Sequence, residues 1–250
     1  MISDLNSKNP DLPSVSIAKV IPNISTDELF SYKKCFIGIS LENPVFEGDS
    51  FCAILHWIVE KFDQTLVVVG DYLCRYNELI LNGSDEDMAA KASSGLGDSF
   101  ILKTEQLFER LLKNQNDPKE KIRLTRWQSH LETDEYKKSK TILDNLFLSD
   151  PGFRAAVEKD ASGFVKRLIK RNKTLVVSGE KALRLSCEYL LEEIAVFSAL
   201  SEQGWRVELY PGSELGVLVY IARGKCLNVP HGLTKRISVE LKIAPGRSSR

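Results

Sequence analysis

Two short apolar runs with an amphipathic segment between them constrain the fold of this chain most. Residues 34–39 and 65–69 are rich in β-branched and aromatic residues and show no polar alternation. Such runs are typical of strands buried on both faces of a parallel sheet. Between them, residues 51–62 carry apolar side chains at helical spacing. A strand, a helix and a strand in this order predict a parallel βαβ unit.

The rest of the chain continues the pattern. Helices are expected over 85–114, 136–148, 152–171 and 180–200, and strands over 121–127, 206–209, 215–222 and 237–243. This order predicts an α/β fold, a Rossmann-type doubly wound, mainly parallel sheet with helices on both faces. We expect an irregular N-terminal segment over 1–28 with a short strand near 16–20, a single α/β catalytic domain over 29–244, and a disordered tail over 245–250.

Composition excludes several classes of protein. The 250 residues are 43% hydrophobic and 27% charged, so a large core is expected and disorder is not. Lys and Arg together number 34, as do Asp and Glu, which excludes a chain that is basic throughout. Five cysteines form no metal-binding or disulfide pattern, and this suits a reducing compartment. No signal sequence or membrane span of roughly 18 apolar residues occurs. We therefore expect a cytoplasmic protein, and the lack of coiled-coil heptads favours a monomer.

A serine follows the first apolar run at the point where the predicted strand ends. In C-F-I-G-I-S-L-E-N (35–43) the hydroxyl of Ser40 falls beyond the carboxyl end of the strand, where open α/β sheets bind ligands. The stretch is not a hydrolase elbow, because that motif needs glycine where Glu42 stands. The residues alone leave two interpretations open, a loop or helix-capping serine and a nucleophile.

Common cofactor signatures are missing from the sequence. No G-x-G-x-x-G follows the first predicted strand, and no phosphate-binding G-x-x-x-x-G-K-[S/T] occurs. The three histidines are scattered at positions 56, 130 and 231, which argues against a metal site. We therefore expect neither a cofactor nor a metal ion.

Tyr189 and Glu193 are four residues apart on the long predicted helix 180–200, so they lie on one helical face. The neighbouring positions on that face are apolar, and a carboxylate there is costly unless it is paired or functional. A satisfied core pair and a functional pair both fit this pattern.

Basic residues are unevenly distributed. Residues 159–184 contain eight basic side chains against two acidic ones. Such a concentration can bind a polyanion on one face of a neutral protein, although a solvated helix face gives the same pattern.

Taken together and in this order, several segments resemble the cyclodipeptide synthases, a family that makes a cyclic dipeptide from two aminoacyl-tRNAs. The matching segments are F-I-G-I-S-L-E-N-P-V-F (36–46), F-D-Q-T-L-V-V-V-G-D (62–71), Y-K-K-S-K…D-P-G-F-R-A-A (136–156), Y-L-L-E-E (189–193) and L-Y-P (209–211). The resemblance implies a fold like the catalytic domain of class I tyrosyl- and tryptophanyl-tRNA synthetases. The ATP-binding signatures of those enzymes are absent here, which agrees with a substrate that arrives already activated.

The resemblance also implies roles for individual residues. Ser40 matches the nucleophile that becomes aminoacylated, and Gly38 matches the small residue beside it. Tyr189 and Glu193 match the pair that holds the substrate's amino group and assists proton transfer. Tyr210 matches a tyrosine of the closing step. The implied reaction passes through an aminoacyl-Ser40 and then a dipeptidyl-enzyme.

The match extends to the family's two subgroups and to the binding of substrate. Tyr210-Pro211 is typical of one subgroup, whereas Asn43 stands where the other has its asparagine. The residues expected to line the first side-chain pocket are Phe36, Val68, Gly70 and Val196. The residues expected to bind tRNA are Lys166, Arg167, Lys170 and Arg171, with Lys103, Arg110 and Lys113 on a neighbouring helix. Two alternatives stay open, a non-catalytic tRNA-binding module and a serine acyltransferase or hydrolase acting on another activated ester.

Overall fold

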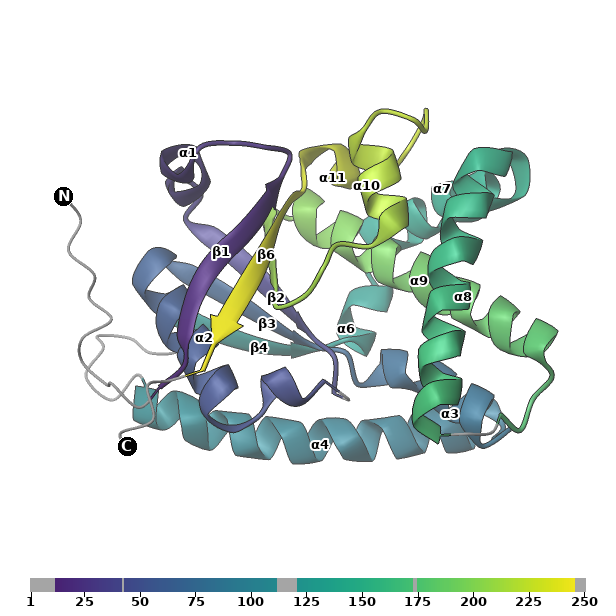
Figure 1. Ribbon diagram of the computed structural model, residues 1–250, viewed down its shortest axis with the longest axis horizontal. Coiled ribbons are helices and arrows are strands. Elements are labelled where there is room, and N and C mark those ends of the chain that lie inside the picture. Colours follow the sequence, from purple (N-terminus) through teal and green to yellow (C-terminus); the bar gives the residue numbers. More distant parts are fainter. Residues whose placement is uncertain (1–11, 42, 112–120, 173–174, 246–250) are drawn as a thin grey trace.

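A six-stranded sheet forms the centre of the computed structural model, which describes residues 12–41, 43–111, 121–172 and 175–245 (Figure 1). The strand order is β1-β6-β5-β2-β3-β4. Strands β6, β5, β2, β3 and β4 are parallel to one another, and β1 pairs antiparallel with β6. The predicted α/β fold with a mainly parallel, doubly wound sheet is confirmed.

The elements have the following bounds. The strands are β1 (Ser14–Ile21), β2 (Lys34–Ile39), β3 (Gln64–Val69), β4 (Ile122–Arg126), β5 (Val207–Tyr210) and β6 (Ile237–Ala244). The helices are α1 (Thr26–Ser31), α2 (Gly48–Lys61), α3 (Arg75–Leu81), α4 (Glu86–Leu111), α6 (Gln128–Leu131), α7 (Asp134–Ser149), α8 (Pro151–Asn172), α9 (Gly179–Glu202), α10 (Gly216–Ala222) and α11 (His231–Lys235), with 3₁₀ turns η1 (Pro44–Phe46) and η2 (Tyr72–Cys74). Within the described residues, no helix is long and apolar enough to cross a membrane.

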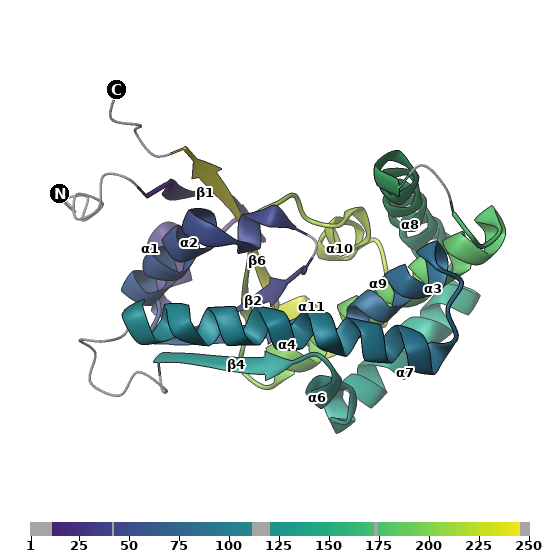
Figure 2. The ribbon, with the colours of Figure 1, turned by 90° about the horizontal axis from the view of Figure 1, so that it is seen from below.

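Two hydrophobic cores lie on the two faces of the sheet. One face packs against α2 and the C-terminal half of α4, with Ile37, Ile54 and Val67 fully buried. The opposite face packs against α9, with α7 and α8 outside it, and buries Phe36, Leu66 and other large side chains. Figure 2 shows α2 and α4 on one side of the strands and α7, α8 and α9 gathered at one end. The carboxyl ends of the parallel strands face this helical end.

The N-terminal segment contains regular structure where an irregular segment was predicted. Within the predicted irregular segment 1–28, residues 14–21 form β1, which pairs with β6 along its whole length, and α1 begins at Thr26. The strand is also longer than the short one expected over 16–20. It lies at the edge of the sheet, Val15 is its one buried residue, and its register shifts between Ile17 and Lys19, so its sequence pattern marks only the central part of the strand.

The segment predicted as a strand over 215–222 is instead helix α10. Its short run of branched apolar residues fits either element, and periodicity cannot separate the two over such a length. In the structure, Val217, Leu218 and Ile221 are buried, which is a helical spacing. The helix start is fixed by Asp160 on α8, whose carboxylate accepts a hydrogen bond from the backbone N–H of Val217 at 2.8 Å.

Candidate active site

The site lies where the order of the parallel strands reverses. From β2 the chain proceeds outward to β3 and β4, and it then returns to the other side of β2 to form β5 and β6. Open α/β sheets have a crevice at this switch point, beyond the carboxyl ends of the two central strands. Ser40 directly follows β2, and Tyr210 is the last residue of β5, so both side chains belong to this crevice.

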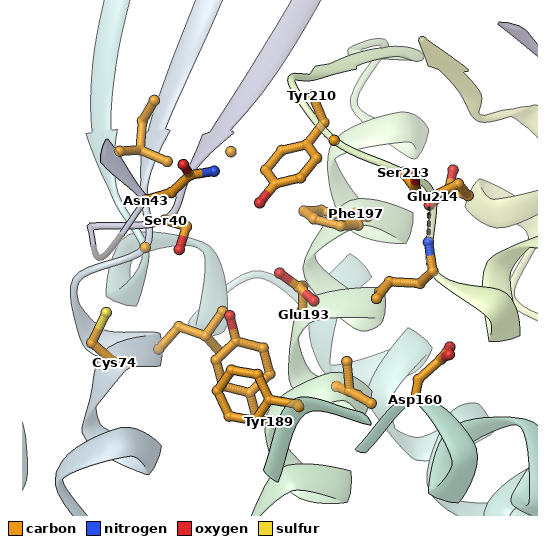
Figure 3. Close-up of a pocket in the computed structure, with 18 of the residues that line it drawn as sticks. Ser40, Asn43, Cys74, Asp160, Tyr189, Glu193, Phe197, Tyr210, Ser213 and Glu214 are labelled. Atoms are coloured by element: carbon orange, nitrogen blue, oxygen red, sulfur yellow. Dashed lines mark hydrogen bonds between the residues drawn. The ribbon is translucent and has the colours of Figure 1, made fainter. Parts of the chain in front are cut away.

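A cavity of about 290 Å³ opens at this crevice. Ser40 and Asn43 from the loop after β2, Tyr189 and Glu193 from α9, and Tyr210 from β5 all line it. Figure 3 shows the hydroxyl of Tyr210 and the carboxylate of Glu193 directed into the space beside Ser40. The four residues predicted to be catalytic are therefore brought together from three separate elements.

The hydroxyl of Ser40 does not cap a helix that the structure describes. The next turn, η1, is capped by Asn43, whose side-chain oxygen accepts the N–H of Val45 at 3.1 Å. The cap of α2 makes no side-chain hydrogen bond. Among the described residues, the hydrogen bond that Ser40 makes to this loop is through its carbonyl, which accepts the N–H of Asn43 at 3.0 Å. Within the described residues the Ser40 side chain therefore caps no helix, and the loop and nucleophile interpretations both remain.

Two of the predicted glycines line the cavity for different reasons. A Cβ atom added at Gly70 would lie 2.7 Å from the carbonyl oxygen of Ile39, so the two strand ends approach too closely for a side chain. A Cβ atom at Gly38 would lie 3.7 Å from the ring of Phe197, which is an ordinary contact. Gly70 thus permits the close approach of the two strand ends, and Gly38 keeps space open beside Ser40.

Adjacent glutamates on α9 have opposite environments. Glu192 is 3% exposed and accepts hydrogen bonds from Arg75 at 2.6 and 2.9 Å, from the Trp127 indole at 3.0 Å and from the Tyr76 hydroxyl at 3.2 Å. Glu193 points to another side of the helix and forms no hydrogen bond or ion pair with any residue that the structure describes. The first carboxylate is therefore structural, and the second is available to a ligand.

Burial and charge both act on the carboxylate of Glu193. Its pKa is raised to about 8, first because burial disfavours the charged form and then because Glu208 and Glu214 repel it, while Arg236 partly opposes this. The pKa of Tyr210 is also raised, mainly by burial and next by the nearby Glu193, whereas a hydrogen bond with Asn43 lowers it. Near neutral pH, Glu193 can either hold or accept a proton, as a general acid or base must.

Aromatic contacts fix the position of Tyr189. Its ring stacks on Phe164 of α8, with centroids 5.3 Å apart and an interplanar angle of 23°. It also meets Tyr76 of α3 edge-on, at 6.1 Å. Rings held on two sides lose little freedom when a ligand binds, so the phenol is positioned before substrate arrives.

Other predicted substrate-binding residues lie outside the cavity lining. Phe36, Val68 and Val196 are fully buried in the core on the α9 side of the sheet, and Pro211 is also not part of the wall. The expected pocket lining therefore needs correction, because these side chains lie one layer too deep. The sequence analysis missed the residues that form much of the wall, namely the largely apolar Leu73, Cys74, Trp127, Leu190 and Phe197 and the polar Asn77. Several of these follow β3, and the strand-end rule that identified Gly70 was the available signal.

The predicted basic residues divide between two regions. Arg167 and Arg171 on α8 are exposed at the cavity wall, and Lys166 and Lys170 are exposed beside them on the same helix. Lys103 lines a separate groove between α2 and α4. Lys113 and the side chain of Arg110 lie outside the described residues. The α8 residues are thus the ones adjacent to the cavity.

Solved structures with similar folds were found by comparison. A cyclodipeptide synthase from Fluoribacter dumoffii superposes with a TM-score of 0.75 at 20% identity, covering 93% of this chain and 99% of its own. A Mycobacterium tuberculosis protein superposes with a TM-score of 0.64 at 14% identity, covering 94% of this chain and 97% of its own. Its structure is described as evidence that cyclodipeptide synthetases are related to type I tRNA synthetases. A cyclodipeptide synthase from Candidatus Glomeribacter gigasporarum, solved bound to Phe-tRNAPhe, superposes with a TM-score of 0.62 at 17% identity, covering 84% of this chain and 86% of its own.

Sequence comparisons point to the same group. No curated protein sequence matches this chain significantly. The family model for cyclodipeptide synthase matches residues 29–202, which is more than half of the chain and spans the elements from α1 to α9. The chain therefore belongs to the cyclodipeptide synthase family.

Proposed function

We propose that this protein joins the aminoacyl groups of two aminoacyl-tRNAs into a cyclic dipeptide, a 2,5-diketopiperazine, without ATP. The observation that carries the proposal is the convergence of Ser40, Tyr189, Glu193 and Tyr210 on one cavity at the switch point of the sheet. Family membership and a relative solved with Phe-tRNAPhe support aminoacyl-tRNA as the substrate. By its Tyr210-Pro211 pair, the chain is proposed to belong to the Tyr-Pro subgroup.

In the first step, the Ser40 hydroxyl attacks the ester carbonyl of an aminoacyl-tRNA. An acyl bond to the Ser40 oxygen forms, the bond to the 3′-oxygen of tRNA breaks, and that oxygen leaves with the proton. One ester replaces another, so the step needs positioning more than driving force. The amine of the aminoacyl-enzyme then lies near Glu193 and Tyr189.

In the second step, the dipeptide must remain bonded to Ser40, so the attacking group is the amine of the aminoacyl-enzyme. Glu193 takes a proton from this amine, which attacks the ester of the second aminoacyl-tRNA and releases the second tRNA. The new terminal amine finally attacks the Ser40 ester, closes the ring and restores the serine hydroxyl. Tyr210, whose hydroxyl points to this space, is proposed to relay the last proton.

Mass spectrometry of cyclic dipeptides tests the proposal. The protein is expressed in bacteria, and the culture medium is compared with that of cells carrying an empty vector. New diketopiperazines support the proposed function. Binding of charged tRNA without any such product favours the non-catalytic module, and turnover of simple activated esters favours the acyltransferase or hydrolase.

Replacing Glu193 by glutamine is expected to allow acylation of Ser40 and to slow dipeptide formation, because the amide cannot accept the proton. In the wild type, dipeptide formation should rise as the pH increases through about 8, where Glu193 ionises, and the variant should lose this dependence. Stopped-flow or quenched mixing at several pH values measures the rate of dipeptide formation in both proteins. An unchanged product rate would show that Glu193 has no role in proton transfer.

Glu193→Gln, which is expected to slow dipeptide formation, should stabilise the folded protein at high pH. A raised pKa means that the folded state holds the proton more tightly, so wild-type stability is fully present below about pH 4.5 and falls as the pH rises through about 8. Glutamine removes this loss. The variant should therefore exceed the wild type by roughly 1–3 kcal/mol at pH 9, measured by denaturant unfolding. Equal stability at pH 5 and pH 9 in both proteins would contradict the assigned environment.

Neutralising Lys166, Arg167, Lys170 and Arg171 to glutamine is expected to weaken tRNA binding at least tenfold and to flatten its salt dependence. Each lost phosphate contact should reduce the slope of log K against log salt by about 0.7–0.9. The matched control neutralises four exposed lysines outside the cavity lining, Lys19, Lys33, Lys61 and Lys242, and should keep the wild-type slope. An unchanged slope in the α8 variant would place tRNA on another face, with the α4 residues next to be tested.

A further inference from the structure

One end of the cavity is acidic. Beyond Glu193, on the side away from Ser40, the wall is formed by Asp160 of α8 and by Glu208 and Glu214 of β5 and the loop after it. Figure 3 shows Glu193 between Ser40 on one side and Asp160 and Glu214 on the other. We call this region the acidic end. Ser213 and Ser238 complete its wall.

The carboxylates of the acidic end exceed the buried positive charge that faces them. The Arg236 guanidinium donates to Glu208 through Nε and to Glu214 at 2.8 Å, so one cation serves two anions. All three side chains are 7% exposed or less. Arg167 and Arg171 also line the cavity, but they are solvent-exposed on α8, where water screens their charge. The two glutamates therefore carry one more formal negative charge than Arg236 neutralises, and these three side chains are largely withdrawn from water.

This excess charge affects the titration of the neighbouring groups. Burial raises the pKa of Glu208, with repulsion from Glu214 added and attraction to Arg236 opposing. The same two glutamates also contribute to the raised pKa of Glu193. A cation bound at this end would relieve the repulsion, because it would favour the charged forms of Glu193 and Glu208.

An independent feature of this wall is the hydroxyl of Ser238. Ser238 is paired in register with Glu208 across β5 and β6, so both side chains project from the same face of the sheet, into the cavity. It is only 6% exposed, yet its hydroxyl forms no hydrogen bond with any residue that the structure describes. Because it lines the cavity without a protein partner in the described chain, this hydroxyl is available to a polar ligand. Within the described residues, no group of three or more His, Cys, Asp or Glu side chains is placed to hold a metal ion.

We propose that the acidic end binds the side chain of one of the two joined amino acids, and that this side chain is cationic, that of lysine or arginine. The inference rests on the proposed function. The α-amine is attached to the α-carbon, next to the ester carbonyl on Ser40. It is therefore held near Ser40, Tyr189 and Glu193. A group that reaches past Glu193 must lie several bonds farther from the carbonyl, as the ammonium of lysine and the guanidinium of arginine do. Both supply the donors that two carboxylates and a hydroxyl can accept.

The test offers the protein whole bacterial tRNA charged with all twenty amino acids and identifies the cyclic dipeptides by mass spectrometry. The wild type is expected to make mainly products that contain lysine or arginine. Glu214→Gln should reduce the ratio of these products to products with two neutral residues at least tenfold, and Ser238→Ala should reduce it severalfold. The control Glu60→Gln, at an exposed position of α2 outside the cavity lining, should leave the ratio unchanged.

The outcomes separate this inference from the proposed function. Cyclic dipeptides made only from neutral residues by the wild type would overturn the inference and leave the proposed function standing. So would an equal loss of all products in a folded Glu214→Gln protein together with an unchanged ratio in Ser238→Ala. The absence of every cyclic dipeptide, with no acylated Ser40, would overturn both.

Discussion

Replacing Ser40 by alanine is expected to reduce cyclic dipeptide formation at least about 10³-fold and to abolish the covalent intermediate. The reason is chemical, since the methyl group of alanine cannot accept an acyl group. The side chain caps no helix that the structure describes and forms no hydrogen bond within that part of the chain. The free energy of unfolding should therefore change by less than about 0.5 kcal/mol.

A matched serine separates chemistry from folding. Ser149→Ala removes an exposed hydroxyl at the end of α7 that donates to the carbonyl of Asn145 at 2.7 Å, and it should retain full activity. Product yield and acylation are measured for both variants with the same charged tRNA. If Ser40→Ala kept more than about a tenth of wild-type product formation, Ser40 would not be the nucleophile.

Replacing Glu192 by alanine is expected to destabilise the fold by about 3–5 kcal/mol. The substitution leaves the buried guanidinium of Arg75 without its carboxylate, and an uncompensated buried charge carries a penalty of this size. It also removes the acceptor of the Trp127 indole and of the Tyr76 hydroxyl. Because these donors come from α3 and from the residue after β4, the loss should separate α9 from the sheet edge that supports the cavity.

Glu188 provides the control for this effect. It lies one turn earlier on α9, is 42% exposed, and pairs with Arg184 at 3.5 Å. Exposed helical pairs of this kind contribute about 0.3–0.5 kcal/mol, so Glu188→Ala should change the free energy of unfolding by about that amount. Denaturant unfolding of the two variants measures both values. Equal effects would mean that the Arg75–Glu192 network does not stabilise the core.

The features that the sequence predicted well are those set by local patterns. The buried runs at 34–39 and 65–69 became β2 and β3, and the long amphipathic segments became α4, α7, α8 and α9 with ends within a few residues of the predicted ones where they are described. Parallel strands share an edge, so the positions of Ser40 and Gly70 at that edge followed from the same patterns.

The features that the sequence could not predict depend on distant contacts. Glu192 and Glu193 are adjacent and chemically identical, and only the packing of Arg75, Trp127 and Tyr76 against α9 distinguishes their environments. The acidic end arises because β5 and β6 pair in register, which places Ser238 beside Glu208. Helix α10 was mistaken for a strand for a similar reason, since its start is fixed by a carboxylate from α8.

The central claim is that Ser40 accepts an aminoacyl group from charged tRNA, and intact-protein mass spectrometry tests it most directly. The protein is mixed briefly with aminoacyl-tRNA and quenched in acid, and its intact mass is measured. The protein is then digested, and the modified peptide is sequenced to locate the adduct. The account predicts a mass increase of one aminoacyl residue located on Ser40, which Ser40→Ala lacks and Glu193→Gln retains. Cyclic dipeptide formation with no adduct, or an adduct that persists in Ser40→Ala, would contradict it.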